Sequence, residues 1–262
     1  MKHDLVTVEI LVIGNELLNG TTLDTNSHWL SIEIEKMGAR LTRKTTVPDN
    51  LAVITRAFKE CLSRKPSWII SLGGLGPTFD DITLQGLAQA TRLPLALDKT
   101  AVNYMKDTFE RRNRSRRLNK ASLKMAVIPK GSIPLRNPVG SASGVLLKRG
   151  PGSIVSLPGV PKEMKAIFQT ELVPRMKKDL FSSSVRKQYW INALGVKESQ
   201  IAPYLKKIME STKGVYVKSH PLGFRKGRSV LHFQLISDKG ADLERASQRL
   251  KKKVISLGGS IR

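Results

Sequence analysis

The stretch Gly73-Gly74-Leu75-Gly76-Pro77-Thr78-Phe79-Asp80-Asp81 indicates how this chain folds, because of what lies on each side of it. Before it runs the apolar segment SWIISL at residues 67–72, which is typical of a buried strand. After it, a helical spacing of apolar residues begins at Leu84. A glycine-rich turn in this position places free backbone N–H groups at the carboxyl end of a strand, where α/β sheets bind ligands. The turn is neither a P-loop, which would end in Gly-Lys-Ser/Thr, nor a Gly-x-Gly-x-x-Gly dinucleotide motif.

Strand and helix patterns alternate around this turn. Residues 7–13 and 40–47 have the composition of strands, and helical patterns follow them at residues 25–37 and 51–62. This alternation predicts right-handed crossovers and a mostly parallel sheet with helices on both faces. Two further strand patterns within residues 144–157 are joined by a Gly-Pro-Gly turn and predict a hairpin.

The chain changes character at residues 179–184, where Ser182-Ser183-Ser184 has the composition of a linker. Beyond it the patterns read strand, helix, strand, strand, helix, which predicts a small α+β domain of the split βαβ type. We therefore expect two domains, at residues 1–178 and 184–262. From Lys177 onward the chain has 19 basic and 6 acidic residues, so the smaller domain is the more basic per residue.

The whole chain of 262 residues has 45 Lys and Arg against 21 Asp and Glu, a formal net charge of +24. Such a field attracts phosphates, nucleic acid or an acidic surface, and a solvated basic surface is an equal alternative. The same two alternatives apply to five arginines between residues 111 and 117.

The single cysteine, Cys61, excludes an internal disulfide and a zinc finger, and its apolar neighbours predict a buried thiol. The first residues lead into a core strand instead of a signal peptide, and no apolar run is long enough to span a membrane. We therefore expect a cytoplasmic protein. Trp68 and Trp190 lie in strand patterns and are predicted to be in the core.

Two carboxylates, Asp80 and Asp81, follow the glycine turn where a phosphate would bind. Carboxylates repel a phosphate unless a divalent metal ion lies between them, so this pair favours a metal-assisted phosphate site. The alternative is that one of the two caps the following helix. Glu16 follows the first strand and is expected at the same edge of the sheet as Asp81.

Asp24 and Asp49 each precede a helical pattern, and from the residues alone helix capping is the favoured role of both. The loop at residues 137–144, NPVGSASG, consists of small residues. It would admit a flat ligand, or it is simply an irregular connection.

Together these segments resemble the CinA family, and within it the N-terminal domain of the MoaB and Mog type, which binds molybdopterin. The motifs occur in order over residues 5–176: Gly14-Asn15-Glu16-Leu17-Leu18-x-Gly20, Asp24-Thr25-Asn26, Pro48-Asp49-Asn50, the glycine turn with Asp80-Asp81, Asn137-Pro138-Val139-Gly140-Ser141-Ala142, and Leu157-Pro158-Gly159-Val160-Pro161-Lys162-Glu163-Met164. The resemblance implies a three-layer α/β/α sandwich, a homo-oligomer such as a dimer or trimer, and a cleft for a nucleotide or a pterin.

Through the bacterial members of the family, the resemblance implies an ADP-ribose pyrophosphatase activity that depends on a divalent metal. Relatives in cofactor biosynthesis adenylylate molybdopterin or insert molybdenum, and they use aspartates that match Asp81 and Asp49. Longer members also carry a deamidase domain of roughly 150 residues, for which we expect no room within these 262 residues.

Our leading hypothesis is therefore a hydrolase of the ADP-ribose pyrophosphatase type. Asp80, Asp81 and Glu16 would hold an ion such as Mg²⁺, Mn²⁺ or Co²⁺, which would activate a water molecule. The catalytic residues would be Asp81 with Asp49 or Asp24 as the base. The phosphate or ligand would contact Gly73, Gly74, Leu75, Gly76, Pro77, Thr78, Asn137, Gly140, Ser141, Pro158 and Gly159.

Two alternatives remain: a molybdopterin-binding or transfer protein without hydrolase activity, and a basic protein associated with nucleic acid. The small domain resembles the KH-like insert of longer relatives, but Gly223-Phe224-Arg225-Lys226-Gly227 is one residue longer than a Gly-x-x-Gly loop. No aromatic platform of the RNA-recognition type is evident, so we expect only weak, non-specific nucleic-acid binding. Asn15, where many relatives have Asp, is a further departure.

Overall fold

The computed structural model describes residues 6–111, 118–181, 187–237 and 239–262. The chain divides into two compact units, Met1–Ser183 and Ser184–Arg262. Of the five clustered arginines only Arg111 is described; the other four and the serines at 182–184 lie outside the described residues. Within the described ranges, no helix is long and apolar enough to cross a bilayer.

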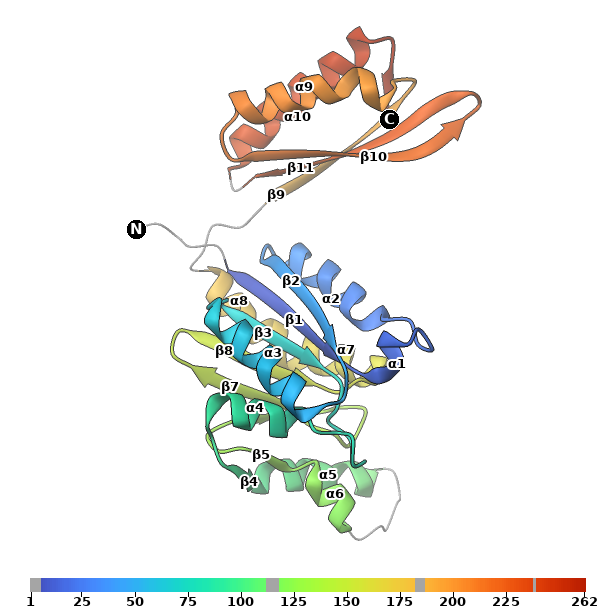
Figure 1. Cartoon of the computed structure of the whole chain (residues 1–262). Helices are drawn as coiled ribbons and strands as arrows, with labels where there is room; N and C mark the ends of the chain where they lie inside the picture. The colour runs from blue at the N-terminus through green and yellow to red at the C-terminus, as the bar shows by residue number, and fades with distance from the viewer. Residues whose placement is uncertain (1–5, 112–117, 182–186, 238) are drawn as a thin grey trace. The chain divides into compact units, whose positions relative to one another are not determined.

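A six-stranded sheet in the order β2-β1-β3-β8-β7-β6 forms the middle of the first unit (Figure 1). Four strands run parallel, namely β1 (Thr7–Ile13), β2 (Arg40–Val47), β3 (Trp68–Leu72) and β8 (Gly152–Leu157). Two antiparallel strands, β7 (Gly144–Arg149) and β6 (Ile133–Leu135), complete the sheet, and β7 with β8 forms the predicted hairpin. Because β1, β3 and β8 are parallel neighbours, their carboxyl ends meet at one edge.

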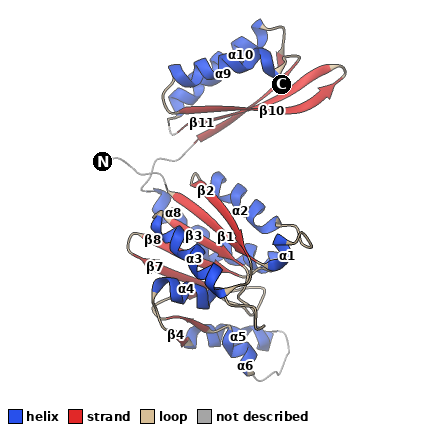
Figure 2. Cartoon of the chain, viewed as in Figure 1, coloured by secondary structure: helices blue, strands red, loops and turns tan. Residues whose placement is uncertain are grey.

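Helices cover both faces of this sheet, so the predicted three-layer α/β/α sandwich is confirmed (Figure 2). On one face lie α2 (Thr25–Lys36) and a continuous helical segment made of α7 (Pro161–Ile167), the π-helix η1 (Phe168–Leu172) and α8 (Val173–Phe181). On the other lie α3 (Leu51–Ser63) and α4 (Thr83–Thr91). Strand β1 serves both cores by alternation: Ile10 and Val12 pack into the first, and Leu11 into the second.

Several short elements were not predicted, because each has too few residues to show a periodic pattern. They are α1 (Asn15–Leu18), α6 (Lys120–Lys124), β6, and the two strands β4 (Leu95–Leu97) and β5 (Val127–Pro129), which pair with each other. Figure 1 shows β4, β5 and α6 grouped with α5 (Lys99–Arg111) beside the main sheet. This group has a small core of its own around Ala101 and Met105.

A buried ion pair, which the sequence did not indicate, joins β1 to the end of α3. The guanidinium of Arg64 donates two hydrogen bonds to the Glu9 carboxylate, at 2.8 and 2.7 Å, and Glu9 is only 3% exposed. The predicted burial of Cys61 is confirmed, and this burial raises the pKa of its thiol to about 12. The hydrogen bond to Glu9 raises the pKa of Arg64 above its ordinary value, so this guanidinium stays charged.

The second unit is a four-stranded antiparallel sheet in the order β10-β11-β9-β12, with two helices. Its elements are β9 (Lys187–Leu194), α9 (Glu198–Ser211), β10 (Val215–Arg225), β11 (Arg228–Ser237), α10 (Gly240–Ser256) and β12 (Ser260–Ile261). Strand β11 lies between β9 and β10 and is antiparallel to both, which is the predicted split βαβ arrangement. Both helices cover the same side of the sheet (Figure 2).

Two details of this unit differ from the predictions. Trp68 is buried as expected, but Trp190 is 52% exposed, so its predicted place in the core is wrong. The neighbouring Ile191 and Ala193 face the helices, and strand alternation turns Trp190 to the opposite face. The segment Gly223–Gly227 belongs to the β10–β11 hairpin, with Lys226 and Gly227 at positive φ in its turn.

Candidate ligand-binding site

The glycine turn lies between the carboxyl ends of two neighbouring strands. The Gly73 N–H donates to the Leu157 carbonyl of β8 at 3.0 Å, and a side-chain carbon at Gly73 would overlap the Ile13 carbonyl of β1. Gly73 and Gly74 both have positive φ, 94° and 65°. A larger residue at Gly74 would also overlap the Thr83 hydroxyl, which itself donates to the Gly73 carbonyl at 2.8 Å. Glycine is therefore required here by both backbone angle and space.

The turn presents three successive N–H groups to its surroundings. Across the part of the chain that the structure describes, the backbone N–H groups of Gly74, Leu75 and Gly76 have no protein acceptor. Successive N–H groups at the end of a parallel strand attract an anion, because their partial positive charges converge on one point.

These groups line a hollow of about 390 Å³. Most of the residues that the sequence predicted for the site meet there, although the sequence separates them widely. They are Glu16, Asp49, Gly73, Gly74, Leu75, Gly76, Pro77, Thr78, Asp80, Asp81, Ser141, Pro158 and Gly159. Asp24, Asn137 and Gly140 do not line this hollow.

Neither Asp80 nor Asp81 caps the following helix, because the N-cap position of α4 is Ile82 and no side chain bonds there. Both carboxylates are held by Thr78 instead. Its backbone N–H donates to Asp81 Oδ2 at 2.8 Å, and its hydroxyl lies within hydrogen-bond distance of both aspartates. The hydrogen bond from Thr78 is the largest of the causes that lower the pKa of Asp80 below its ordinary value.

Asp49 is not a helix cap either, since Asn50 caps α3 by accepting hydrogen bonds from two N–H groups. Asp49 Oδ2 accepts a hydrogen bond from the Asn15 N–H at 2.8 Å, and Asn15 Oδ1 accepts one from the Asp49 N–H at 3.3 Å. This reciprocal pair fixes the start of α1, where Glu16 occupies the first turn. Asn15 is thus an acceptor in this pair, a role that its neutral amide oxygen fulfils.

Asp24 has the capping role that its sequence position favours. Its Oδ1 accepts a hydrogen bond from the Ser27 N–H at 2.9 Å at the start of α2. It lines a smaller, adjoining hollow together with Glu16 and Gly73. The carboxylate that caps α2 is the same group that was predicted as a catalytic base, so the two roles of Asp24 compete.

Asn137 is buried beneath the site instead of lining it. Its Oδ1 accepts from the N–H groups of Val139 and Gly140, and its Nδ2 donates to the Ala142 carbonyl at 2.8 Å and to Glu163 Oε2 at 2.7 Å. It thereby shapes the loop that places Ser141 at the hollow. A side chain at Gly140 would overlap the Glu163 carboxylate.

Sequence reasoning missed Glu163 as a site residue, although this carboxylate lines the hollow from α7. Its position in the Leu-Pro-Gly-Val-Pro-x-Glu-Met motif was the available signal. The predicted ligands of a divalent ion, Asp80, Asp81 and Glu16, all line the hollow, but their grouping gives the ion no support. Within the described ranges, no three His, Cys, Asp or Glu side chains are grouped so that they could hold a metal ion.

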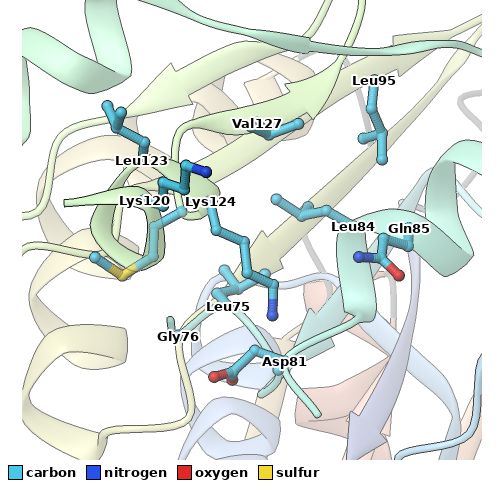
Figure 3. A pocket seen from close by; sticks show the side chains of 12 residues that line it. Leu75, Gly76, Asp81, Leu84, Gln85, Leu95, Lys120, Leu123, Lys124 and Val127 are labelled. Atoms are coloured by element: carbon cyan, nitrogen blue, oxygen red, sulfur yellow. The ribbon is translucent and has the colours of Figure 1, made fainter. Parts of the chain in front are cut away.

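A second hollow, of about 270 Å³, adjoins the first at the glycine turn. The two share Gly74, Leu75, Gly76, Asp81 and Met125. The walls of the second are mainly apolar, and Figure 3 shows that they come from α4, α6, β4 and β5: Leu84, Leu95, Leu123 and Val127.

Lys124 crosses this second hollow. Its ammonium points toward the glycine turn and Asp81 in Figure 3, and it donates a hydrogen bond to the Thr78 carbonyl. The sequence did not indicate this contact, because α6 is too short to be predicted. It adds a positive charge beside the three N–H groups.

Comparison with known proteins shows to which protein family a chain with this site belongs. Residues 9–178 match the family described as "Probable molybdopterin binding domain", and the chain belongs to that family. It is also a CinA-type member: the crystal structure of the protein CinA with unknown function from Thermoplasma acidophilum is 35% identical. The match has a TM-score of 0.58 and covers 66% of this chain and 98% of that one.

Two further proteins are similar. A protein of Pyrobaculum arsenaticum is 38% identical over 94% of this chain and 90% of its own length. The crystal structure of the molybdopterin biosynthesis enzyme MoaB from Thermus thermophilus is 19% identical, with a TM-score of 0.46 over 68% of this chain and 97% of that one.

Proposed function

We propose that the first unit binds a molybdopterin-type ligand, a pterin that carries a phosphate group. The observation that supports this most directly is the set of three unpaired N–H groups at Gly74, Leu75 and Gly76, with the Lys124 ammonium beside them. These groups would hold the phosphate by charge-assisted hydrogen bonds. The family description names the same class of ligand.

The carboxylates around the hollow fit the other end of such a ligand. A pterin presents an amino group and ring N–H groups, which donate hydrogen bonds, and a carboxylate is an acceptor of matching geometry. Asp49 and Glu163 line the hollow and are already fixed in place by Asn15 and Asn137. The acceptors are therefore oriented before the ligand arrives, which reduces the entropy cost of binding.

Co-purification tests the proposal. The full chain is isolated from cells that make molybdopterin, denatured and oxidised, and the released pterin is measured by fluorescence. We expect pterin in near-stoichiometric amount from the native chain and much less from a Gly74→Ala variant. Equal amounts of pterin from both proteins would contradict a site at the glycine turn.

Hydrolysis of a diphosphate bond is a second candidate, and the carboxylates that line the phosphate-binding hollow favour it as sources of a general base. Because no three acidic, His or Cys side chains of the described residues are grouped so that they could hold an ion, we derive no metal-dependent step. A panel of ADP-ribose, dinucleotides and nucleotide sugars, each with Mg²⁺, Mn²⁺ or Co²⁺, would separate the candidates. Turnover that Asp49→Asn abolishes would favour the hydrolase, and tight pterin binding without turnover would favour a binding or transfer protein.

A further inference from the structure

The sheet of the second unit has one covered face and one open face. Ile191, Val217 and Phe233 point toward α9 and α10 and are buried in the core of this unit. The residues between them along each strand point the other way. On the described residues of this unit, no helix lies over that second face (Figure 1).

Three cross-strand rows make up the open face, which we define by its nine residues. The rows are Tyr216–Ile236–Gln188, Lys218–Gln234–Trp190 and His220–His232–Asn192. Trp190 and Tyr216 remain 52% and 48% exposed. The Trp190 ring lies 5.7 Å from that of His220, measured between centroids. An aromatic platform is thus present, contrary to the expectation from the sequence.

The charge of the strands that carry this face has one sign. The charged residues on β9, β10, β11 and the hairpin turn are all basic: Lys187, Lys218, Arg225, Lys226 and Arg228. The acidic residues of the described part of this unit lie on the helices, on α9 and α10. On the face itself the charged residue is Lys218, and Arg225 and Lys226 lie at the hairpin end of the same sheet, so a polyanion would be attracted.

We propose that the open face binds a single-stranded segment of nucleic acid. Trp190 and Tyr216 are on strands separated by β11, so their backbones are roughly 10 Å apart across the sheet, room for two bases of one segment. Unpaired bases stack on such rings, and Lys218, which lies on the same face, would contact a phosphate. In a duplex the bases are stacked inside the helix, so their faces are not accessible to Trp190 and Tyr216.

Fluorescence anisotropy of the full chain with a labelled oligouridylate of roughly 12 nucleotides, at two salt concentrations, tests this. We expect Trp190→Ala and Tyr216→Ala each to weaken binding about fivefold or more, with no change in the salt dependence, because neither removes a charge. Trp190→Phe should retain most of the affinity. Lys218→Ala should reduce the slope of log affinity against log salt by about 0.7.

Matched controls lie on the helical side. Tyr204→Ala removes a ring that packs against Lys253 of α10, and Lys252→Ala removes an exposed charge there. Both should leave the affinity within about twofold of the native value. Because Trp190 is exposed, its variants should fold, and circular dichroism checks this.

Three results would overturn the proposal. The first is an equal loss of nucleic-acid affinity in the control variants and in the open-face variants, which would indicate diffuse attraction to a basic domain. The second is a duplex of the same sequence that binds as tightly as the single strand. The third is a Trp190→Ala variant that binds normally but sediments as a smaller species, which would assign the face to a second copy of the chain.

Discussion

The two sheets of this protein differ in what they leave uncovered. The first has helices on both faces, so its faces are covered, and the edge where its parallel strands end carries a hollow for a ligand. The second has helices on one face, so a whole surface of side chains remains exposed. An edge offers backbone N–H groups in a concave site, and a face offers rings and long side chains on a flat one.

This difference determines the kind of ligand expected at each. A concave edge suits a small anion, because a few converging donors can surround a phosphate. A flat basic face suits a polymer, because each contact is weak and many must add up. The predictions below test whether the edge and the face act independently.

The largest effect is expected from removing the second unit. A chain of residues 1–183 contains the whole of the first sheet and both of its helical layers. It should fold, bind pterin as the full chain does, and lose most of its affinity for single-stranded nucleic acid, keeping only the weak attraction of its remaining positive charge. Titration of both ligands checks this. If the shortened chain folds but does not bind pterin, the second unit completes the first site.

Among single replacements, the largest effect on ligand binding is expected from Gly74→Ala. The added carbon would overlap the Thr83 hydroxyl at a positive φ, so the turn must move and its N–H groups lose their alignment. We expect pterin affinity to fall by about 10- to 100-fold, the equivalent of roughly 1.4–2.8 kcal/mol. Nucleic-acid binding should not change.

Gly131→Ala is the matched control, because Gly131 also has a positive φ but has nothing within 4 Å of the added carbon. It should cost about 1 kcal/mol of stability and leave pterin affinity unchanged. If both variants bind pterin equally well, steric exclusion at the turn is not what shapes the site.

The sequence predicts β1, β3 and β8 well because each combines several aliphatic residues with a glycine- or proline-containing turn directly after it. It also brings Asp81, Gly76 and Asp49 to one edge, since parallel strands end there together. The individual roles are harder to predict. Whether Asp49 caps a helix or pairs with Asn15 depends on a distance across two strands, and no local pattern contains it.

Exposure on the second sheet was also unpredictable from composition. Trp190 belongs to the apolar-looking run YWINAL, and such a run is buried on both faces only if both are covered. The number of helices that follow, α9 and α10, is enough for one face. Alternation with Ile191 and Ala193 was the signal that could have placed Trp190 outside.

A third prediction concerns the other end of the first sheet, where the Glu9–Arg64 pair contributes to stability and not to binding. Arg64→Ala would leave a buried carboxylate without its partner, so the free energy of unfolding should fall by about 3 kcal/mol. Lys36→Ala breaks the exposed pair with Glu33 and should cost at most about 0.5 kcal/mol. Urea denaturation measures both.

A double replacement refines this result. Glu9→Leu together with Arg64→Met removes both charges and should recover most of the stability lost in Arg64→Ala. Pterin binding should be unaffected in all of these variants. A loss of ligand affinity in Arg64→Ala at temperatures where it remains folded would show that the two ends of the sheet are coupled.

The smallest effect is expected at Thr78, within the edge itself. Its hydroxyl contacts the Asp80 carboxylate, and this contact is the largest cause of the lowered pKa of that group. Thr78→Val removes the hydroxyl with little change in shape, so the pKa of Asp80 should rise toward its ordinary value. Thr78→Ser keeps the donor and should keep the pKa low. Carboxyl NMR titration distinguishes the two variants.

The sign of the pH effect follows from this direction. A carboxyl whose pKa is lower in the folded than in the unfolded chain stabilises the fold above its unfolded pKa, and this contribution is lost as pH falls through the folded pKa. Thr78→Val should therefore differ from the native chain only in strongly acidic solution. Because Asp80 is exposed, the difference should be larger in the pKa of Asp80 than in the stability of the fold. An unchanged pKa would mean that Lys124, a smaller cause of the shift, and the backbone hold the carboxylate ionised without Thr78.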